Sequence, residues 1–142
     1  ITMELGGHAP VLVFDDCDLD KTLDMLVPQK FRNAGQVCVS PTRFFVQEGI
    51  YDAFAKGFAE RTAGVKMGDG LDADTRMGPL ANSRRLPAVA GLVEDARAKG
   101  ARVLAGGEPG KGGFFFQPTV LADVPDDAQA MNVEPFGPVA LM

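Results

Sequence analysis

The chain has 142 residues, a length typical of a single domain, and 46% of them are hydrophobic and 23% charged, the mix of an ordinary folded protein. Its net charge of -5 argues against nucleic-acid binding, which needs a basic surface. No apolar run approaches the ~20 residues of a membrane span, and two cysteines without a framework spacing exclude a disulfide-stapled secreted scaffold. We therefore expect a soluble, cytoplasmic protein that binds neither nucleic acid nor membranes.

The two ends of the chain suggest that it is part of a longer one. It begins at Ile1 without an initiator methionine, and it ends on the apolar run Pro138–Met142 without a turn or a charge. Natural termini are commonly polar and frayed. We expect the last residues to be a strand and the chain to be a fragment.

The first part of the chain predicts a strand and a helix. The continuous apolar run over residues 10–14 is typical of a buried strand in a parallel sheet. Asp18 can cap a helix whose apolar positions repeat on one face as far as Phe31. Pro28 lies inside this pattern, and we expect it to kink the helix. The helix should end at residues 33–36.

The remaining elements continue this alternation of strands and helices. They are, in order, a strand over 43–47, a helix marked by Ile50, Phe54 and Phe58, a long loop over 65–81, a helix over 86–99 disturbed by Pro87, a strand over 102–105, a glycine-rich turn over 106–113 and an extended region over 114–121. Such alternation predicts an α/β domain with a mostly parallel sheet flanked by helices.

No metal site and no dinucleotide loop of the usual kind are predicted. His8, Cys17 and Cys38 are the only His and Cys residues, and no two have the close spacing of a ligand pair. The segment GDGLDA at 68–73 has glycines spaced as in a dinucleotide-binding loop. A polar loop follows it instead of an apolar helix, so we interpret it as a turn.

Cys38 is the candidate nucleophile. It lies in NAGQVCVS, between a helix and a strand, and loops at such junctions place side chains at strand ends, where α/β sheets bind ligands. A thiol is strongly nucleophilic, although an arbitrary free cysteine is more often buried and inert. Cys17 is expected to be the buried, less reactive thiol. Two carboxylates could manage protons, Glu4 in MELGG and Glu134 in EPFGP, because both lie in glycine or proline turns.

Three sequence blocks together resemble the signatures of the NAD(P)-dependent aldehyde dehydrogenase superfamily: MELGGHAP at 3–10, NAGQVC at 33–38 and EPFGP at 134–138. Their order and separations match those of the family, as do the segments at 68–80 and 117–120. The resemblance covers essentially the whole chain. The segment KFRNAGQ at 30–36 is similar to the succinate-semialdehyde branch.

The resemblance implies a reaction and the residues that perform it. Cys38 corresponds to the nucleophile that attacks a small aldehyde to form a thiohemiacetal, which becomes a thioester when hydride passes to the nicotinamide. Glu4 corresponds to the general base that activates water for hydrolysis of the thioester. The backbone N–H of Cys38 would be one half of an oxyanion hole.

The resemblance also implies contacts with NAD or NADP. Glu134 corresponds to the acid that contacts the nicotinamide ribose, and Phe136 to a ring that packs near the nicotinamide. Gly6 and Gly7 let the backbone approach cofactor and substrate. By the same resemblance, residues 1–142 are part of a catalytic domain, and the cofactor-binding domain and the C-terminal end lie outside them. The parent is expected to be a homo-oligomer, and the fragment alone to be inactive.

Two other functions stay open at this point. A CoA-acylating aldehyde dehydrogenase would resolve the thioester with CoA, but Glu4 argues against it because such an enzyme can dispense with a base that activates water. A non-catalytic binding or structural relative needs none of the set Cys38, Glu4 and Glu134.

Overall fold

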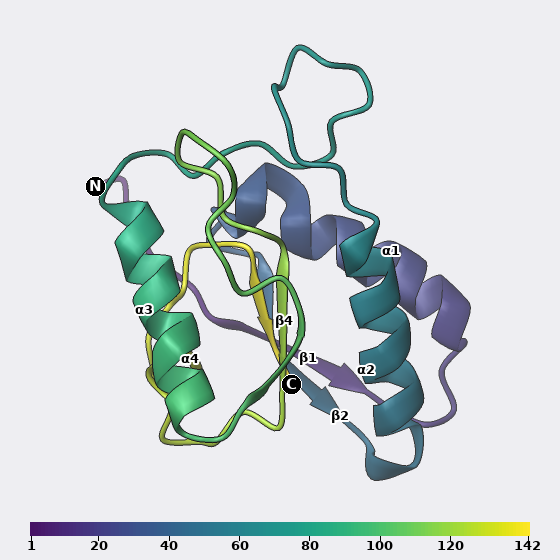
Figure 1. The fold of residues 1–142 in the computed structure, drawn as a ribbon. Helices are drawn as coiled ribbons and strands as arrows, with labels where there is room; N and C mark the ends of the chain where they lie inside the picture. The colour runs from purple at the N-terminus through teal and green to yellow at the C-terminus, as the bar shows by residue number, and fades with distance from the viewer.

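The computed structural model describes residues 1–142, and its strands form one five-stranded sheet. The elements in chain order are β1 (Ala9–Val13), α1 (Leu19–Phe31), the 3-10 helix η1 (Arg32–Gly35), β2 (Pro41–Val46), α2 (Glu48–Ala63), α3 (Arg85–Ala98), β3 (Arg102–Ala105), β4 (Thr119–Ala122), α4 (Gln129–Asn132) and β5 (Val139–Leu141). Figure 1 shows α1 and α2 on one side of the strands and α3 on the other.

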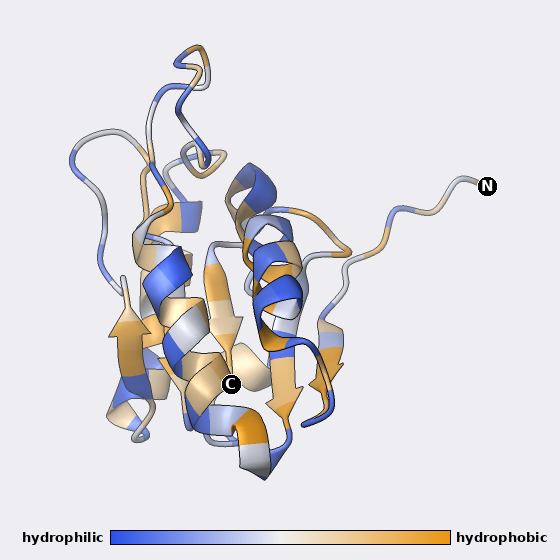
Figure 2. Ribbon diagram, turned by 90° about the vertical axis from the view of Figure 1, so that its right-hand side faces the viewer, coloured by the Kyte–Doolittle hydropathy of each residue, from blue (hydrophilic) through white to orange (hydrophobic).

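The sheet confirms the predicted fold class. Its strand order is β1-β2-β5-β4-β3, and every neighbouring pair is parallel except β3 and β4. The last strand of the chain, β5, therefore lies in the middle of the sheet, and Val139–Leu141 are completely buried. The strands are largely apolar (Figure 2). All residues of β4 and β5 are buried, as expected for strands covered on both faces. The burial predicted for residues 10–14 was wrong, because Leu12 and Phe14 are exposed and β1 is covered on one face only.

The helices begin and end for local reasons. The Asp18 carboxylate accepts a hydrogen bond of 3.2 Å from the Lys21 N–H and so caps α1. The helix continues past Pro28 to Phe31. In α3, Pro87 lies in the first turn, where its missing N–H costs no helical hydrogen bond.

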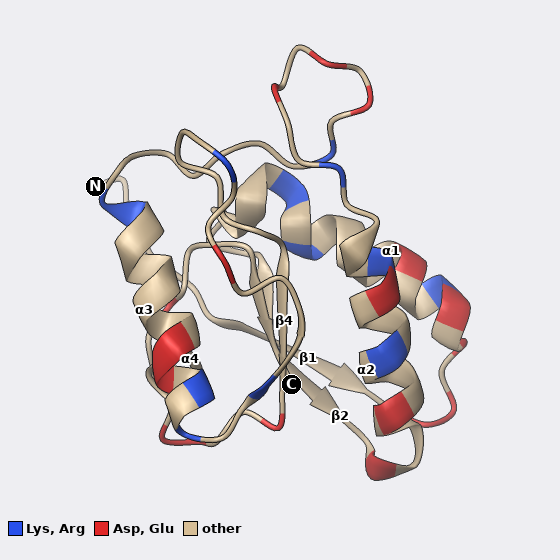
Figure 3. Ribbon diagram, in the orientation of Figure 1, with Lys and Arg blue, Asp and Glu red and all other residues tan.

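The outer surfaces of α1 and α2 carry both signs of charge (Figure 3). Arg61 of α2 bridges to Asp20 and Asp24 of α1, each at 2.8 Å. These pairs are exposed and contribute little to stability, so the apolar faces beneath them hold the two helices together. No helix of the structure combines the length and the apolar character needed to cross a membrane.

Two further sequence predictions were wrong in detail, and one short helix was missed. Only Thr119–Ala122 of the extended region joins the sheet, because residues 108–117 fold back on themselves, with Gly110 N–H donating to Phe115 and Gln117 N–H to Glu108. The short helix α4 was missed, since four residues are too few to show a periodic apolar face. Cys17 is half-buried rather than buried, because it lies in the turn after β1.

The core is centred on a cluster of phenylalanines, and Phe58 is its hub. Its ring centroid lies 6.3 Å from that of Phe31, 5.1 Å from Phe44 and 5.7 Å from Phe54.

We expect Phe58→Ala to lower the free energy of unfolding by about 3–5 kcal/mol, because it leaves a cavity where α1, α2 and β2 meet. Urea unfolding checks this, with the exposed Leu71→Ala as the control, expected to change it by less than about 0.5 kcal/mol. A loss below about 1 kcal/mol for Phe58→Ala would contradict this view of the core.

Candidate functional site

The loop that carries Cys38 begins with three consecutive left-handed residues. Asn33, Ala34 and Gly35 have φ angles of 51°, 53° and 69°. Glycine and asparagine tolerate this region, whereas alanine costs roughly 1–2 kcal/mol there. Strain of this kind persists only where surrounding contacts hold it, and it is often found at functional sites.

Gln36 supplies part of the support for this strained turn. Its side-chain amide donates to the Asn33 carbonyl at 3.1 Å and to the Pro79 carbonyl at 3.4 Å. Its side-chain oxygen accepts from the Ala81 N–H at 2.8 Å. The buried Gln36 side chain thus ties the loop to the end of the long segment between α2 and α3.

Cys38 lies in a tight turn directly before β2. The Ser40 N–H donates to the Val37 carbonyl at 2.9 Å and closes this turn. The Cys38 thiol is free and half-buried, and the Cys38 N–H donates to no group of the chain. That free N–H is available to a bound ligand, as an oxyanion hole requires.

Gly7 joins the first sequence block to the other two. Its N–H donates to Oε1 of Glu134 at 3.0 Å, across 127 positions of sequence. A Cβ at Gly7 would overlap the backbone carbonyl of Cys38, so only glycine lets the two backbones approach this closely. In the same way, a Cβ at Gly35 would overlap the Gly137 carbonyl. The structure therefore brings all three blocks together.

The edge of the sheet at which they meet follows from the topology. Gly7 precedes β1, Cys38 precedes β2 and Glu134 precedes β5, and these three strands are neighbours and parallel. Their amino ends therefore lie at one edge. This differs from the usual rule for open α/β sheets, in which ligands bind at the carboxyl ends.

The predicted cofactor-binding residues Glu134 and Phe136 each leave part of the side chain free for a ligand at this edge. Oε2 of Glu134 has no donor in the chain and lies so close to Gly6 that a Cβ there would overlap it. Phe136 is partly exposed, and its φ of 40° is unusual for a bulky residue. Arg85 of α3 fixes that segment by donating to the carbonyls of Pro135 and Phe136.

Glu4 makes fewer contacts with the rest of the chain than the other predicted residues do. It lies on the exposed segment that precedes β1, which runs away from the rest of the fold in Figure 2. Its carboxylate makes no hydrogen bond or ion pair. The role of Glu4 as a base stays a prediction.

Lys30 is a buried charge that sequence reasoning missed. It lies in the last turn of α1, is 1% exposed, and donates from Nζ to the Ser40 hydroxyl at 3.3 Å. Burial lowers the pKa of its amine from 10.5 to about 7. The signal was present in the sequence, because position 30 lies between the core positions Val27 and Phe31 on the helix face that is buried.

His8, next to Gly7 in the first sequence block, is a second partly buried titratable group. Its Nε2 donates to the Ala130 carbonyl at 3.0 Å, which leaves Nδ1 without a partner. Burial, the Arg43 guanidinium and the Lys30 charge lower its pKa. Arg43 also donates to the His8 carbonyl, at 2.8 Å from Nη2.

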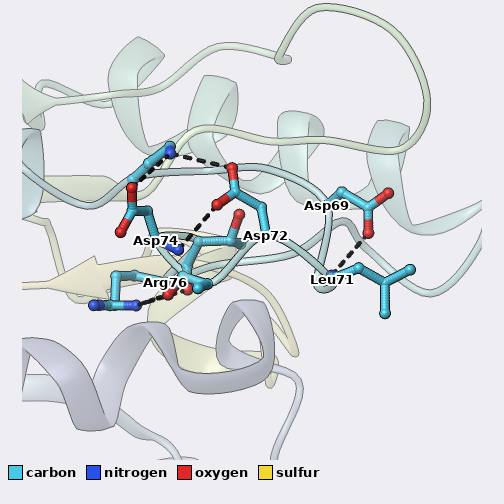
Figure 4. Close-up of polar contacts among 8 residues, drawn as sticks. Asp69, Leu71, Asp72, Asp74 and Arg76 are labelled. Atoms are coloured by element: carbon cyan, nitrogen blue, oxygen red, sulfur yellow. Dashed lines mark hydrogen bonds and ion pairs between the residues drawn. The ribbon is translucent and has the colours of Figure 1, made fainter.

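The acidic loop at 69–74 does not belong to this site. Its carboxylates accept hydrogen bonds from the loop's own N–H groups, Asp69 from Leu71 and Asp72 from Asp74 (Figure 4). Lys66 adds an ion pair to Asp72 at 3.2 Å. Since these acidic groups occupy the N–H donors that a phosphate would need, the segment is a turn, as its sequence predicted.

The aldehyde dehydrogenase family matches residues 1–142, and the chain belongs to this family. It is 51% identical over 140 residues to 4-(hydroxymethyl)benzenesulfonate dehydrogenase of Comamonas testosteroni, covering 99% of this chain and 29% of that protein. It is 47% identical over 141 residues to the NADP(+)-dependent succinate-semialdehyde dehydrogenase of Escherichia coli K12, again covering 99% of this chain and 29% of that protein.

Solved structures agree with these comparisons. Succinate-semialdehyde dehydrogenase from Burkholderia pseudomallei superposes with a TM-score of 0.95 at 44% identity, covering 99% of this chain and 29% of that one. The chain therefore spans less than a third of the length of the relatives it matches. The resemblance inferred from the three sequence blocks is confirmed at the level of family and fold.

The contact of Gly7 with Cys38 leads us to expect that alanine substitutions at two glycines change the free energy of unfolding in opposite directions. Gly7→Ala is expected to lower the free energy of unfolding by about 1–3 kcal/mol, because its Cβ overlaps the Cys38 carbonyl. Gly91→Ala in α3 meets nothing within 4 Å and should raise it by about 0.5–1 kcal/mol. The rate of iodoacetamide labelling at Cys38 should change in Gly7→Ala and stay the same in Gly91→Ala. Equal effects of the two substitutions would show that the Gly7 contact is absent.

Proposed function

We propose that the full-length protein carrying this chain oxidises an aldehyde to a carboxylic acid, with NAD(P)+ as the oxidant and water as the second substrate. The observation that carries this proposal is the convergence at Gly7, which joins the nucleophile loop at Cys38 to the carboxylate of Glu134. Membership of the aldehyde dehydrogenase family supports it. The chain forms part of a catalytic domain in this proposal.

The residues of this chain perform the covalent steps. The Cys38 thiolate adds to the aldehyde carbon, and the Cys38 N–H stabilises the oxygen as it becomes negatively charged. When bound, NAD(P)+ supplies the hydride acceptor that converts the thiohemiacetal on Cys38 to a thioester. Water then attacks the thioester, Glu4 takes its proton, and the carboxylic acid leaves as the thiol is restored.

The chain offers two groups to the cofactor. Oε2 of Glu134 can accept a hydrogen bond from a ribose hydroxyl while Oε1 holds Gly7, and Phe136 presents an exposed ring nearby in the sequence. The remaining contacts belong to residues outside this chain. We expect the isolated chain to bind NAD(P) negligibly, up to millimolar cofactor.

The role of Glu4 is tested by replacing it with a residue of the same size. In the full-length enzyme, Glu4→Gln should lower steady-state turnover by about 10²–10⁴-fold, because thioester hydrolysis loses its base. NAD(P)H formation in stopped flow should then show a burst near one equivalent per site, followed by a slow phase. If Glu4 also deprotonates Cys38, the burst itself slows.

Three controls complete this experiment. Cys38→Ser should abolish the burst, and the exposed Glu60→Gln should leave both phases unchanged. Added CoA should not accelerate turnover; an acceleration would favour a CoA-acylating enzyme. An unchanged steady-state rate in Glu4→Gln would show that Glu4 is only a turn residue.

We propose further that the aldehyde carries an anionic group, and that Arg32 recognises it. The named compounds of the Comamonas and Escherichia relatives carry a sulfonate and a carboxylate. Arg32 begins the turn that leads to Cys38, and it lines a surface hollow together with Arg61 and Arg76. Arg61 binds two aspartates and Arg76 binds carbonyls of its own loop, whereas the Arg32 guanidinium has no partner.

Replacement of Arg32 tests this specificity. Arg32→Gln should lower kcat/KM for succinate semialdehyde by about 10–10²-fold, the effect of losing one charge-assisted contact, mainly through KM. It should change kcat/KM for butyraldehyde, an uncharged aldehyde of equal length, by less than about threefold. Arg84→Gln, an exposed arginine before α3, serves as the control for general loss of charge. Equal losses for both aldehydes would contradict anion recognition by Arg32.

Localisation and assembly belong to the same proposal. We place the protein in the cytoplasm, because both cysteines are free thiols. We also propose that the full-length protein is a homo-oligomer. The exposed apolar side chains of Leu12, Phe14 and Phe45 on and beside β1 and β2 support this, since such a patch is commonly covered by another surface.

A further inference from the structure

Lys30 is a buried cation that the proposed chemistry does not use. Its side chain is 1% exposed, and its Nζ has no carboxylate within ion-pair distance. A methionine would fill similar space without the cost of taking a charge out of water. The position of Lys30 in the core is therefore unfavourable for folding alone.

Lys30 lies against both sides of the turn that presents Cys38. Its Nζ donates to the Ser40 hydroxyl at 3.3 Å, and that hydroxyl lies 3.4 Å from the Lys30 carbonyl, which it can donate to in return. On the other side, a Cβ at Gly35 would lie 3.3 Å from Nζ. The ammonium thus lies beneath the loop, between a residue that precedes Cys38 and one that follows it.

We propose that Lys30 is a positioning residue for Cys38: it holds the loop between Gly35 and Ser40 in the shape that presents the thiol. This inference rests on the proposed function, because it takes Cys38 as the nucleophile. Ser40 is the residue through which Lys30 acts on the backbone of the turn.

Few charged groups lie near Lys30. Burial is the main cause that lowers the pKa of His8, and the charges of Arg43 and Lys30 lower it further. Glu134 accepts from the Gly7 N–H through Oε1 and forms no ion pair with Lys30. No carboxylate therefore offsets the buried ammonium.

The depressed pKa of Lys30 separates its effect on folding from its effect on Cys38. The folded state holds this proton only below a pH of about 7, whereas the unfolded state holds it up to about 10.5. The destabilisation by the buried ammonium is therefore complete below pH 7 and fades as the pH rises toward 10.5. Both protonation forms of the amine can donate to Ser40, so the contact with the turn persists above pH 7.

The test is Lys30→Met in the full-length protein, with the rate of Cys38 alkylation by iodoacetamide measured from pH 5.5 to 10 by peptide mapping. The alkylation rate should fall by about tenfold across this pH range, because the turn loses the Nζ contact that holds Ser40 and Cys38 is less well positioned. The thermal midpoint should stay equal or rise, with the larger gain at pH 6.5 than at pH 9.5. Lys56→Met, which removes an exposed lysine of α2, should change neither.

A second variant keeps the inference testable if Lys30→Met does not fold. Ser40→Ala removes the hydroxyl through which Lys30 acts on the turn, so alkylation of Cys38 should slow to a similar extent. An unchanged rate of Cys38 alkylation in the folded variants, or a lower thermal midpoint with an unchanged rate, would overturn the inference and leave Lys30 a packing residue. Because alkylation needs no aldehyde, slower alkylation in variants of a protein that oxidises no aldehyde would refute the proposed function alone.

Discussion

The hydrogen bond from the Gly7 N–H to the Glu134 carboxylate is the contact on which the site depends. It closes a gap of 127 positions in the sequence, and it is possible only because β1, β2 and β5 are neighbouring parallel strands. Three loops that precede these strands must then meet at one edge of the sheet. With the Cys38 carbonyl packed against Gly7, a carboxylate, a backbone and a thiol are held together by main-chain geometry.

The loop that carries the thiol is held by more contacts than a surface turn needs. Ala34 adopts a left-handed conformation that is unfavourable for its side chain, and Gln36 ties the turn to Pro79 and Ala81. Lys30 adds a buried charge beneath it. Each of these costs folding free energy or ordering entropy, and together they limit the positions that Cys38 can take. A nucleophile that must meet a carbonyl carbon within a few tenths of an ångström needs such a limit.

Much of the fold could be predicted from the sequence, because periodic apolar patterns, a helix cap and turn residues are local signals. The helix ending at Phe31 and the buried strand at Val139–Leu141 are examples. The four residues of α4 and the split of the extended region could not, since they depend on what packs against them. The candidate site likewise has features that local sequence signals indicate and features that depend on tertiary packing. Three blocks indicated the candidate residues, and the helix face shared with Val27 and Phe31 could have indicated the burial of Lys30. The left-handed turn at Asn33–Gly35 arises from tertiary contacts that no single segment encodes.

The exchange rate of the Gly7 amide hydrogen measures the central contact directly. Hydrogen–deuterium exchange of the full-length protein, read at single-residue resolution by electron-transfer fragmentation, should show Gly7 protected by at least about tenfold relative to Leu5, which lies on the same exposed segment without a backbone partner. In Glu134→Ala that protection should disappear. A Gly7 amide that exchanges as fast in the native protein as in Glu134→Ala would show that the three loops are not joined there.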